Sequence, residues 1–174
     1  EKNYSLSIGQ IYNFEENEHI PHRSSLHQKT SDMVGKGFVK VSDNLKITNE
    51  FSFDHNFSEI NYNDFEANLI LGNTDFNLKY LEENNHIGST NYIKSDIKLT
   101  LNDSNAVKFD VRRNLETDST EFYSLAYDYL NDCLRAGLVF RRQFYKDRDI
   151  ESSDSLMFQI SLIPVGDILT PKVK

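Results

Sequence analysis

The chain has 174 residues, with 19 Lys and Arg against 27 Asp and Glu, so its formal net charge is −8 at pH 7. This length suits one domain or a piece of a larger one. The acidic balance argues against a nucleic-acid-binding protein, which needs a basic surface facing the phosphates. No apolar run approaches the ~18 residues of a membrane-spanning helix. Membrane barrels stay allowed, because alternating strands never produce such a run.

The beginning of the sequence and its cysteine content bound the architecture further. The residues after Glu1 already alternate (Tyr4, Leu6, Ile8), and no basic stretch followed by an apolar one precedes them, which favours an internal fragment over a chain with a signal peptide. Cys133 is the single cysteine, so a disulfide within the chain and a cysteine-rich zinc site are both excluded. On general grounds, such a residue is a small buried hydrophobe.

Apolar and polar residues alternate with a period of two along almost the whole chain, which is typical of strands with one apolar and one polar face. The pattern predicts ten strands, at 3–14, 31–42, 45–55, 60–71, 75–83, 90–101, 106–115, 121–130, 133–145 and 155–164. Ordinary globular strands average ~5–6 residues, whereas tilted strands that cross a bilayer need ~9–11. Most of the predicted strands have the longer, membrane-crossing length.

The predicted connections alternate in length, because every odd-numbered one is longer than the even-numbered ones beside it. The short ones carry turn residues: Asp43-Asn44, Gly72-Asn73-Thr74, Asn102-Asp103-Ser104 and Asn131-Asp132. Outer-membrane barrels have short periplasmic turns on one rim and longer external loops on the other. The sequence therefore predicts an all-β fold, part of an antiparallel transmembrane β-barrel with about ten long strands.

Charged residues occupy mid-strand positions on the polar faces of the predicted strands. In a barrel these side chains would line a wet lumen, and the candidates are Lys108, Asp110, Arg112, Arg135 and Arg141. A soluble sheet with one face in water explains the same charges equally well.

No site for bond-making chemistry stands out. His19, His22 and His27 have a spacing that could ligate a metal, but no supporting ligand follows on a rigid element, and a polar surface loop is favoured. The paired carboxylates fall in predicted loops, and neither a nucleophile elbow nor a Gly-rich phosphate loop is present. We therefore expect no catalytic residue, no metal and no cofactor.

Three stretches, 127–134, 140–150 and 155–160, together resemble the C-terminal end of the LptD (OstA) family of LPS-assembly outer-membrane proteins. Asn91-Tyr92, which follow Glu82-Glu83-Asn84, and residues 109–113 are similar to the same family's barrel. The resemblance implies that residues 1–174 are the C-terminal part of a larger barrel in the Gram-negative outer membrane. It also implies a function, the insertion of lipopolysaccharide into the outer leaflet.

The resemblance implies partners and site residues as well. Partners would be a plug lipoprotein of the LptE type, and a periplasmic LPS bridge protein that contacts an N-terminal domain outside this sequence. The lipid would leave through a lateral gate between the first and last barrel strands. Residues 155–164 would be that last strand and 165–174 a periplasmic tail. The gate residues would be Leu156, Phe158, Ile160, Leu162 and Pro164.

Specific expectations follow for Pro164 and for Cys133. Pro164 removes one ladder donor and could shorten the seam of the gate, or it could simply end the strand. The family commonly carries two adjacent cysteines near Cys133, joined by disulfides to the distant N-terminal domain. Here the neighbour is Asp132. The resemblance therefore implies a single bridge from Cys133, to a partner outside this sequence, in an oxidising periplasm.

Two rival interpretations stay open. One is a free-standing ten-stranded outer-membrane barrel enzyme, such as an omptin-like protease or a phospholipase, because ten is an allowed even number of strands. The other is a soluble β-sandwich that acts as a binding module. The enzyme would need acidic or Ser and His residues grouped at one rim, and the sequence shows no such group.

Overall fold

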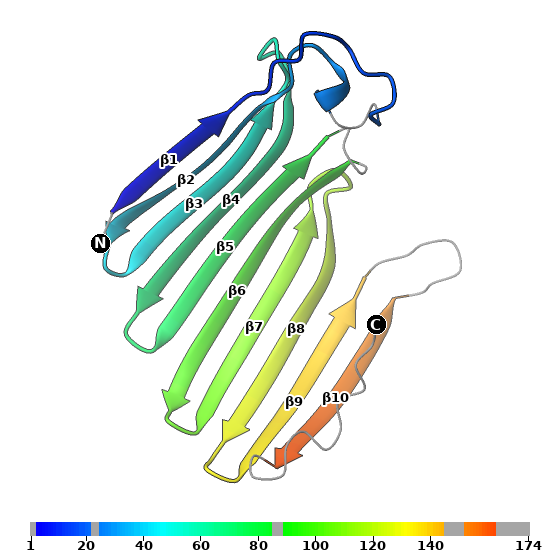
Figure 1. Ribbon diagram of the computed structural model, residues 1–174. Helices are drawn as coiled ribbons and strands as arrows, with labels where there is room; N and C mark the ends of the chain where they lie inside the picture. Colours follow the sequence, from blue (N-terminus) through cyan, green and yellow to red (C-terminus); the bar gives the residue numbers. More distant parts are fainter. Residues whose placement is uncertain (1–2, 22–24, 85–88, 145–151, 163–174) are drawn as a thin grey trace. The chain divides into compact units, whose positions relative to one another are not determined.

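The computed structural model describes residues 3–21, 25–84, 89–144 and 152–162. One antiparallel sheet contains ten strands in the order of the sequence, so that each strand pairs with its neighbours along the chain (Figure 1). The strands are β1 (Tyr4–Gly9), β2 (Met33–Ser42), β3 (Leu45–Phe53), β4 (Ile60–Leu71), β5 (Thr74–Glu83), β6 (Thr90–Asn102), β7 (Asn105–Asn114), β8 (Ser119–Leu130), β9 (Leu134–Gln143) and β10 (Ser153–Leu162). Within the described part of the chain, the only helix is a short 3-10 turn, η1 (Ser25–His27).

The chain divides into two compact units. The first contains residues 1–69, 77–93 and 114–118, and the second contains 70–76, 94–113 and 119–174. In the first unit β1, β2, β3 and β4 pair in sequence, with register shifts at Lys40/Ser42 and at Ser52/Phe53. In the second unit β9 pairs with β8 on one side and with β10 on the other, and neither ladder shows a register shift.

The lengths of the strands confirm the expectation of long ones. Strands β2 to β10 contain between 9 and 13 residues each. This matches the ~9–11 residues with which a tilted strand crosses a bilayer. The all-β antiparallel fold class is therefore confirmed.

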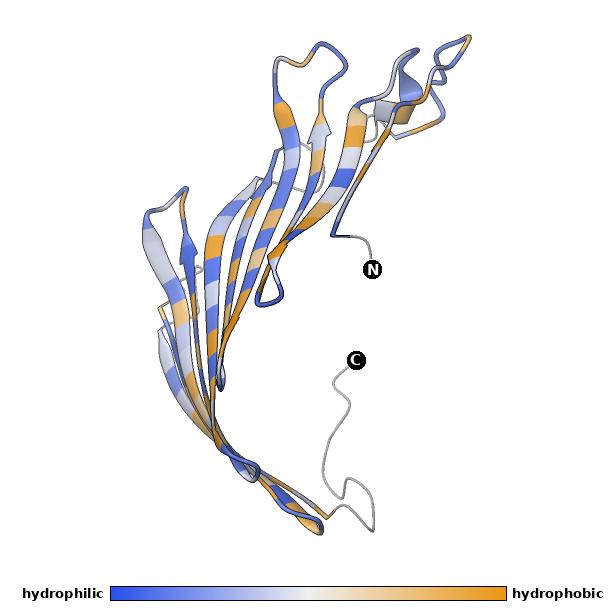
Figure 2. Cartoon of the chain, turned by 90° about the vertical axis from the view of Figure 1, so that its left-hand side faces the viewer, coloured by the Kyte–Doolittle hydropathy of each residue, from blue (hydrophilic) through white to orange (hydrophobic). Residues whose placement is uncertain are grey.

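The apolar faces of the strands are not covered by other parts of the described chain. Hydrophilic and hydrophobic residues alternate along the strands (Figure 2). Among the described residues the only buried hydrophobic side chain is Phe122, which is 7% exposed. A soluble sandwich buries apolar residues between two layers, whereas many Leu, Phe and Tyr side chains of these strands are exposed, as in lipid-facing strands.

The connections sort by length as the sequence predicts. The short ones are 43–44, 72–73, 103–104 and 131–133, and the long ones are 10–32, 54–59, 84–89, 115–118 and 144–152. In an antiparallel sheet with sequential strands, alternate connections leave at opposite rims. Gly72, with φ 60°, occupies the first position of the two-residue turn between β4 and β5, where a type II′ hairpin needs a glycine.

The first strand is shorter than expected, because β1 ends at Gly9 and not at residue 14. The Ser31 hydroxyl accepts a hydrogen bond from the Ile11 backbone N–H at 2.8 Å, in place of a ladder carbonyl. Beyond this point only an isolated bridge between Tyr12 and Thr30 remains. The predicted strand 3–14 is confirmed over Tyr4–Gly9 and was wrong beyond Gly9, where a serine side chain interrupts the ladder.

The last strand begins earlier than the predicted residue 155, at Ser153. Its described part ends at Leu162. Pro164 and the predicted tail 165–174 lie outside the described residues.

Candidate functional site

A basic and acidic pair joins β7 and β8 on their polar faces. Lys108 Nζ forms an ion pair with Asp128 Oδ2, so the two strands turn these positions to the same side. This pair lines a hollow of about 340 Å³, which Lys98 and Arg135 also line. The structure thus brings two of the predicted lumen residues, Lys108 and Arg135, to one surface of the second unit.

Two other predicted lumen residues meet at one aromatic ring. The Cζ atom of Arg141, on β9, lies 4.1 Å from the centroid of the Phe122 ring, and the Cζ atom of Arg112, on β7, lies 5.3 Å from it. Arg112 Nε also forms an ion pair with Glu121 Oε2. Guanidinium groups at these distances from an aromatic face are attracted by its quadrupole. Phe122 therefore brings together two arginines from strands that flank β8.

The sequence analysis did not single out Phe122 as a site residue, although a signal was available. Phe122 is a large aromatic residue on the polar side of the β8 alternation, two positions before Ser124. Asp110 is the fifth predicted lumen residue, and alternation along β7 places it on the same face as Lys108 and Arg112. Within the described part of the chain Asp110 has no ion-pair partner.

The opposite face of β10 is apolar and exposed. Leu156 is 69% exposed and Phe158 is 68% exposed, and Ile160 and Leu162 follow on the same face. Leu156 lies opposite Phe140 of β9, and Phe158 lies opposite Leu138. The four described residues of the predicted gate strand thus form one continuous apolar row.

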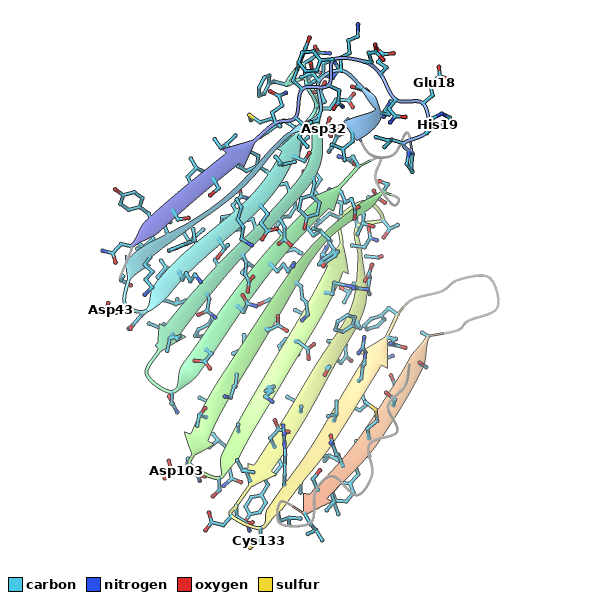
Figure 3. All side chains as sticks on the ribbon, in the orientation of Figure 1. Glu18, His19, Asp32, Asp43, Asp103 and Cys133 are labelled. Atoms are coloured by element: carbon cyan, nitrogen blue, oxygen red, sulfur yellow. The ribbon has the colours of Figure 1, made fainter. Side chains whose placement is uncertain are left out.

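Cys133 lies in the short connection between β8 and β9 and is exposed (Figure 3). Asn131 Oδ1 accepts hydrogen bonds from the backbone N–H groups of Cys133, at 3.0 Å, and Leu134, at 2.7 Å. The asparagine thus organises the turn and leaves the thiol outside it. The general expectation of a buried cysteine was wrong, because this cysteine belongs to a turn and not to a strand.

A buried acidic residue anchors the long connection between β1 and β2. Asp32, 7% exposed, accepts hydrogen bonds at Oδ2 from Asn61 Nδ2, at 2.8 Å, and from Ser52 Oγ, at 3.4 Å (Figure 3). Its backbone N–H donates to Ser25 Oγ at 2.9 Å. The end of the connection is therefore tied to β3 and β4 through one carboxylate.

The three histidines considered as metal ligands do not form a described cluster. His19 and His27 lie in the connection between β1 and β2, and His22 lies outside the described residues. Across the described ranges, no group of three or more His, Cys, Asp or Glu side chains is arranged to hold a metal ion.

Asp54 organises the connection between β3 and β4. Its Oδ1 atom accepts hydrogen bonds from the backbone N–H groups of Ser58, at 2.6 Å, and Glu59, at 3.0 Å. Its Oδ2 atom accepts from the Ser58 hydroxyl at 3.0 Å. The Glu59 N–H, followed by the Ser58 hydroxyl and N–H, holds the pKa of this carboxyl below its ordinary value of 3.8.

The lowered pKa of Asp54 predicts the pH range in which this loop keeps its structure. The ionised carboxylate stabilises the loop above pH 3.8, and this contribution is lost as the pH falls through the lower pKa of the folded state. We expect the backbone amide NMR shifts of Ser58 and Glu59 to stay constant down to about pH 4 and to change below it. The same titration of Asp54→Asn should show no such step. A step at the same pH in that variant would contradict the assignment.

A search for helical membrane spans among the described residues finds no helix long and apolar enough.

Comparisons with known proteins agree with these features. A family model described as LPS transport system D (LptD) matches residues 1–115. This range includes Asn91-Tyr92 and residues 109–113, whereas the three C-terminal stretches from 127 to 160 lie beyond it. No curated protein matches the chain. Because the match covers more than half of the sequence and the sheet has the strands of an outer-membrane barrel, the chain belongs to the LptD family, whose role is lipopolysaccharide transport at the outer membrane.

Proposed function

We propose that residues 1–174 form the C-terminal part of the family's outer-membrane barrel and that β10 is one side of a lateral gate for lipopolysaccharide. The observation that supports the gate most directly is the way in which β10 pairs. It forms ten residue pairs with β9, and it is an edge strand in the described sheet. An unpaired strand edge in lipid costs several kcal/mol for each unsatisfied group. The free edge of β10 therefore needs another strand, held weakly enough to separate.

The alternation of connection lengths supports an orientation for this barrel. Short turns belong to the periplasmic rim, so in this orientation Cys133 would lie in the oxidising periplasm and the longer connections would face outside the cell. An exposed thiol at that rim supports a disulfide to another part of the full-length protein. Thiol labelling of Cys133 in the non-reduced full-length protein would contradict this bridge.

The polar face supports the proposed partners. A plug lipoprotein of the LptE type would occupy the lumen, the space that the face with Lys108, Asp110, Arg112, Arg135 and Arg141 would line. The periplasmic LPS bridge protein would contact the N-terminal domain of the full-length protein. Neither partner requires a catalytic residue, a metal or a cofactor in this chain, since transport through a seam makes and breaks no covalent bond.

A crosslink across the seam tests the gate. In the full-length protein, Phe158→Cys is paired with a cysteine scanned along the first barrel strand, and newly made lipopolysaccharide at the cell surface is measured. We expect oxidation to lower export at least about tenfold and reduction to restore it, because a covalent seam cannot open.

The matched control crosslinks β9 to β10, two neighbouring strands that stay paired when the proposed gate opens. Phe140→Cys with Leu156→Cys crosslinks opposite residues of β9 and β10, and export should be unchanged. Complete crosslinking at the seam with normal export would refute the gate. Pro164→Ala tests the separate hypothesis that Pro164 shortens the seam, because unchanged export would leave the proline as a strand end only.

A further inference from the structure

We infer that Arg112 and Arg141 form, around Phe122, a binding site for the phosphate groups of the transported glycolipid. The inference rests on the proposed function and adds the chemical group that the polar face recognises. It starts from one arginine whose hydrogen-bonding capacity the described chain does not use.

Among the described residues, Arg141 is a cation without an ion-pair partner. Its Nε atom is buried and has no hydrogen-bond partner, and no described carboxylate forms an ion pair with it. A buried donor left without an acceptor is destabilising. The Cζ atom of Arg141 lies over the Phe122 ring, 4.1 Å from its centroid, and this contact supplies no acceptor. An acceptor oxygen from a ligand would satisfy it.

Further polar side chains lie on the same face as Arg141. Ser124 of β8 and Ser155 of β10 lie directly opposite Arg141 in the two ladders, so all three side chains share one face of the sheet. Ser124 is 7% exposed. Arg112 reaches the same Phe122 ring from β7, and its partner Glu121 offsets only one of the two positive charges.

The charge of the surrounding face favours an anion. The basic side chains on the polar faces of β6 to β9 are Lys94, Lys98, Lys108, Arg112, Arg135 and Arg141. The acidic side chains are Asp96, Asp110 and Asp128, to which we add Glu121 because it pairs with Arg112. This face is therefore net positive, although the whole chain carries −8. A local potential opposite to that of the chain concentrates anions at the face.

Phosphate fits the donors of this site. A guanidinium presents paired N–H donors that match phosphate oxygens, and its positive charge strengthens each hydrogen bond. A phosphate monoester carries about two negative charges near neutral pH, enough to engage both arginines. The site lies one strand from β10, so a phosphate held there would keep the glycolipid beside the proposed seam.

The test uses photo-crosslinking in the full-length protein with its native partners. A benzoylphenylalanine replaces Gln143, which lies opposite Phe122 in the ladder, and the probe is purified lipopolysaccharide. We expect Arg141→Gln to lower the crosslinking yield at least about tenfold, because a charge-assisted hydrogen bond is lost. Arg141→Lys should lower it less. The folded state of each variant is checked by its heat-dependent mobility on a gel.

The matched control is Arg142→Gln. Arg142 is the next residue of β9, faces the other side of the sheet and pairs with Asp154 at 3.4 Å, so its loss should leave the yield unchanged. Lipopolysaccharide stripped of its phosphates should crosslink to the unsubstituted arginines as weakly as the intact lipid does to Arg141→Gln.

Three outcomes would overturn the inference. Equal yields from Arg141→Gln and Arg142→Gln would exclude the arginine, and equal yields from intact and phosphate-free lipid would exclude the phosphate. If inorganic phosphate at the same concentration as the lipid abolished the crosslink, the site would be one for free phosphate, and a lipid headgroup would be excluded. If no variant or crosslinking position captured lipopolysaccharide and cells exported it normally without this protein, the proposed function itself would fall.

Discussion

Replacing Phe158 by arginine is expected to destabilise the assembled barrel by about 2–4 kcal/mol, the cost of a lipid-facing arginine near the middle of the bilayer. Phe158 is the sixth of the ten residues of β10 and is 68% exposed on its apolar face. A guanidinium there would enter hydrocarbon without a counter-ion. We expect several-fold less folded, heat-modifiable protein in the outer membrane, and a lower urea midpoint for unfolding from lipid vesicles.

Gln159→Arg is the matched control for this substitution. Gln159 is the next residue of the same strand, so its side chain leaves the opposite face, where it lies opposite Gly137. An arginine added to that face would enter a wet lumen and should cost less than about 1 kcal/mol. Equal loss of folded protein in the two variants would show that β10 does not separate lipid from water.

The period of two predicted most of the architecture, because it depends only on which side of a strand each residue occupies. Tyr123, Leu125 and Tyr127 alternate with polar or small residues over a bilayer-crossing length, and β8 (Ser119–Leu130) follows this pattern. Turn residues such as Gly72 separated the strands at the short connections. These signals are local, so they can be seen without knowing which strands pair.

Contacts that depend on long-range pairing were not predictable in the same way. Ser31 and Asp32 end the long connection by bonding to Ile11, Ser52 and Asn61, through side-chain geometry that alternation does not encode. The register shift at Ser52/Phe53 moves positions along β4 relative to β3. The cluster at Phe122 likewise could be predicted only from the pairing of β8 with β9, because alternation alone predicts the face on which each residue lies and not its neighbours.

The second large effect is expected at Gly35, where an aromatic ring covers the backbone of β2. Gly35 lies directly opposite Phe51 of β3. A Cβ atom added at Gly35 would overlap the Phe51 Cζ atom and would lie 2.7 Å from Cε1 and Cε2. The ring thus takes the space that a side chain at position 35 would need, an arrangement in which an aromatic residue compensates for a glycine in a strand near the sheet edge.

Gly35→Val should therefore destabilise the barrel by about 1–3 kcal/mol, the usual cost of adding atoms to a filled site. Gly35→Ala should cost less, because the end of the Phe51 side chain can turn away. Urea unfolding from lipid vesicles measures both. Gly9→Ala is the control, since the nearest atom to its added Cβ would be Val34 Cγ2 at 4.0 Å.

A double-mutant cycle separates the ring from the backbone. If the cost of Gly35→Val comes from displacing the ring, it should fall by more than half when Phe51→Ala is already present, because the space is then empty. The coupling between two residues in contact is commonly 0.5–3 kcal/mol. Equal costs in the two backgrounds would mean that valine disturbs the β1–β2 ladder, where Ile8 lies opposite Gly35, and that the ring is not packed on the glycine.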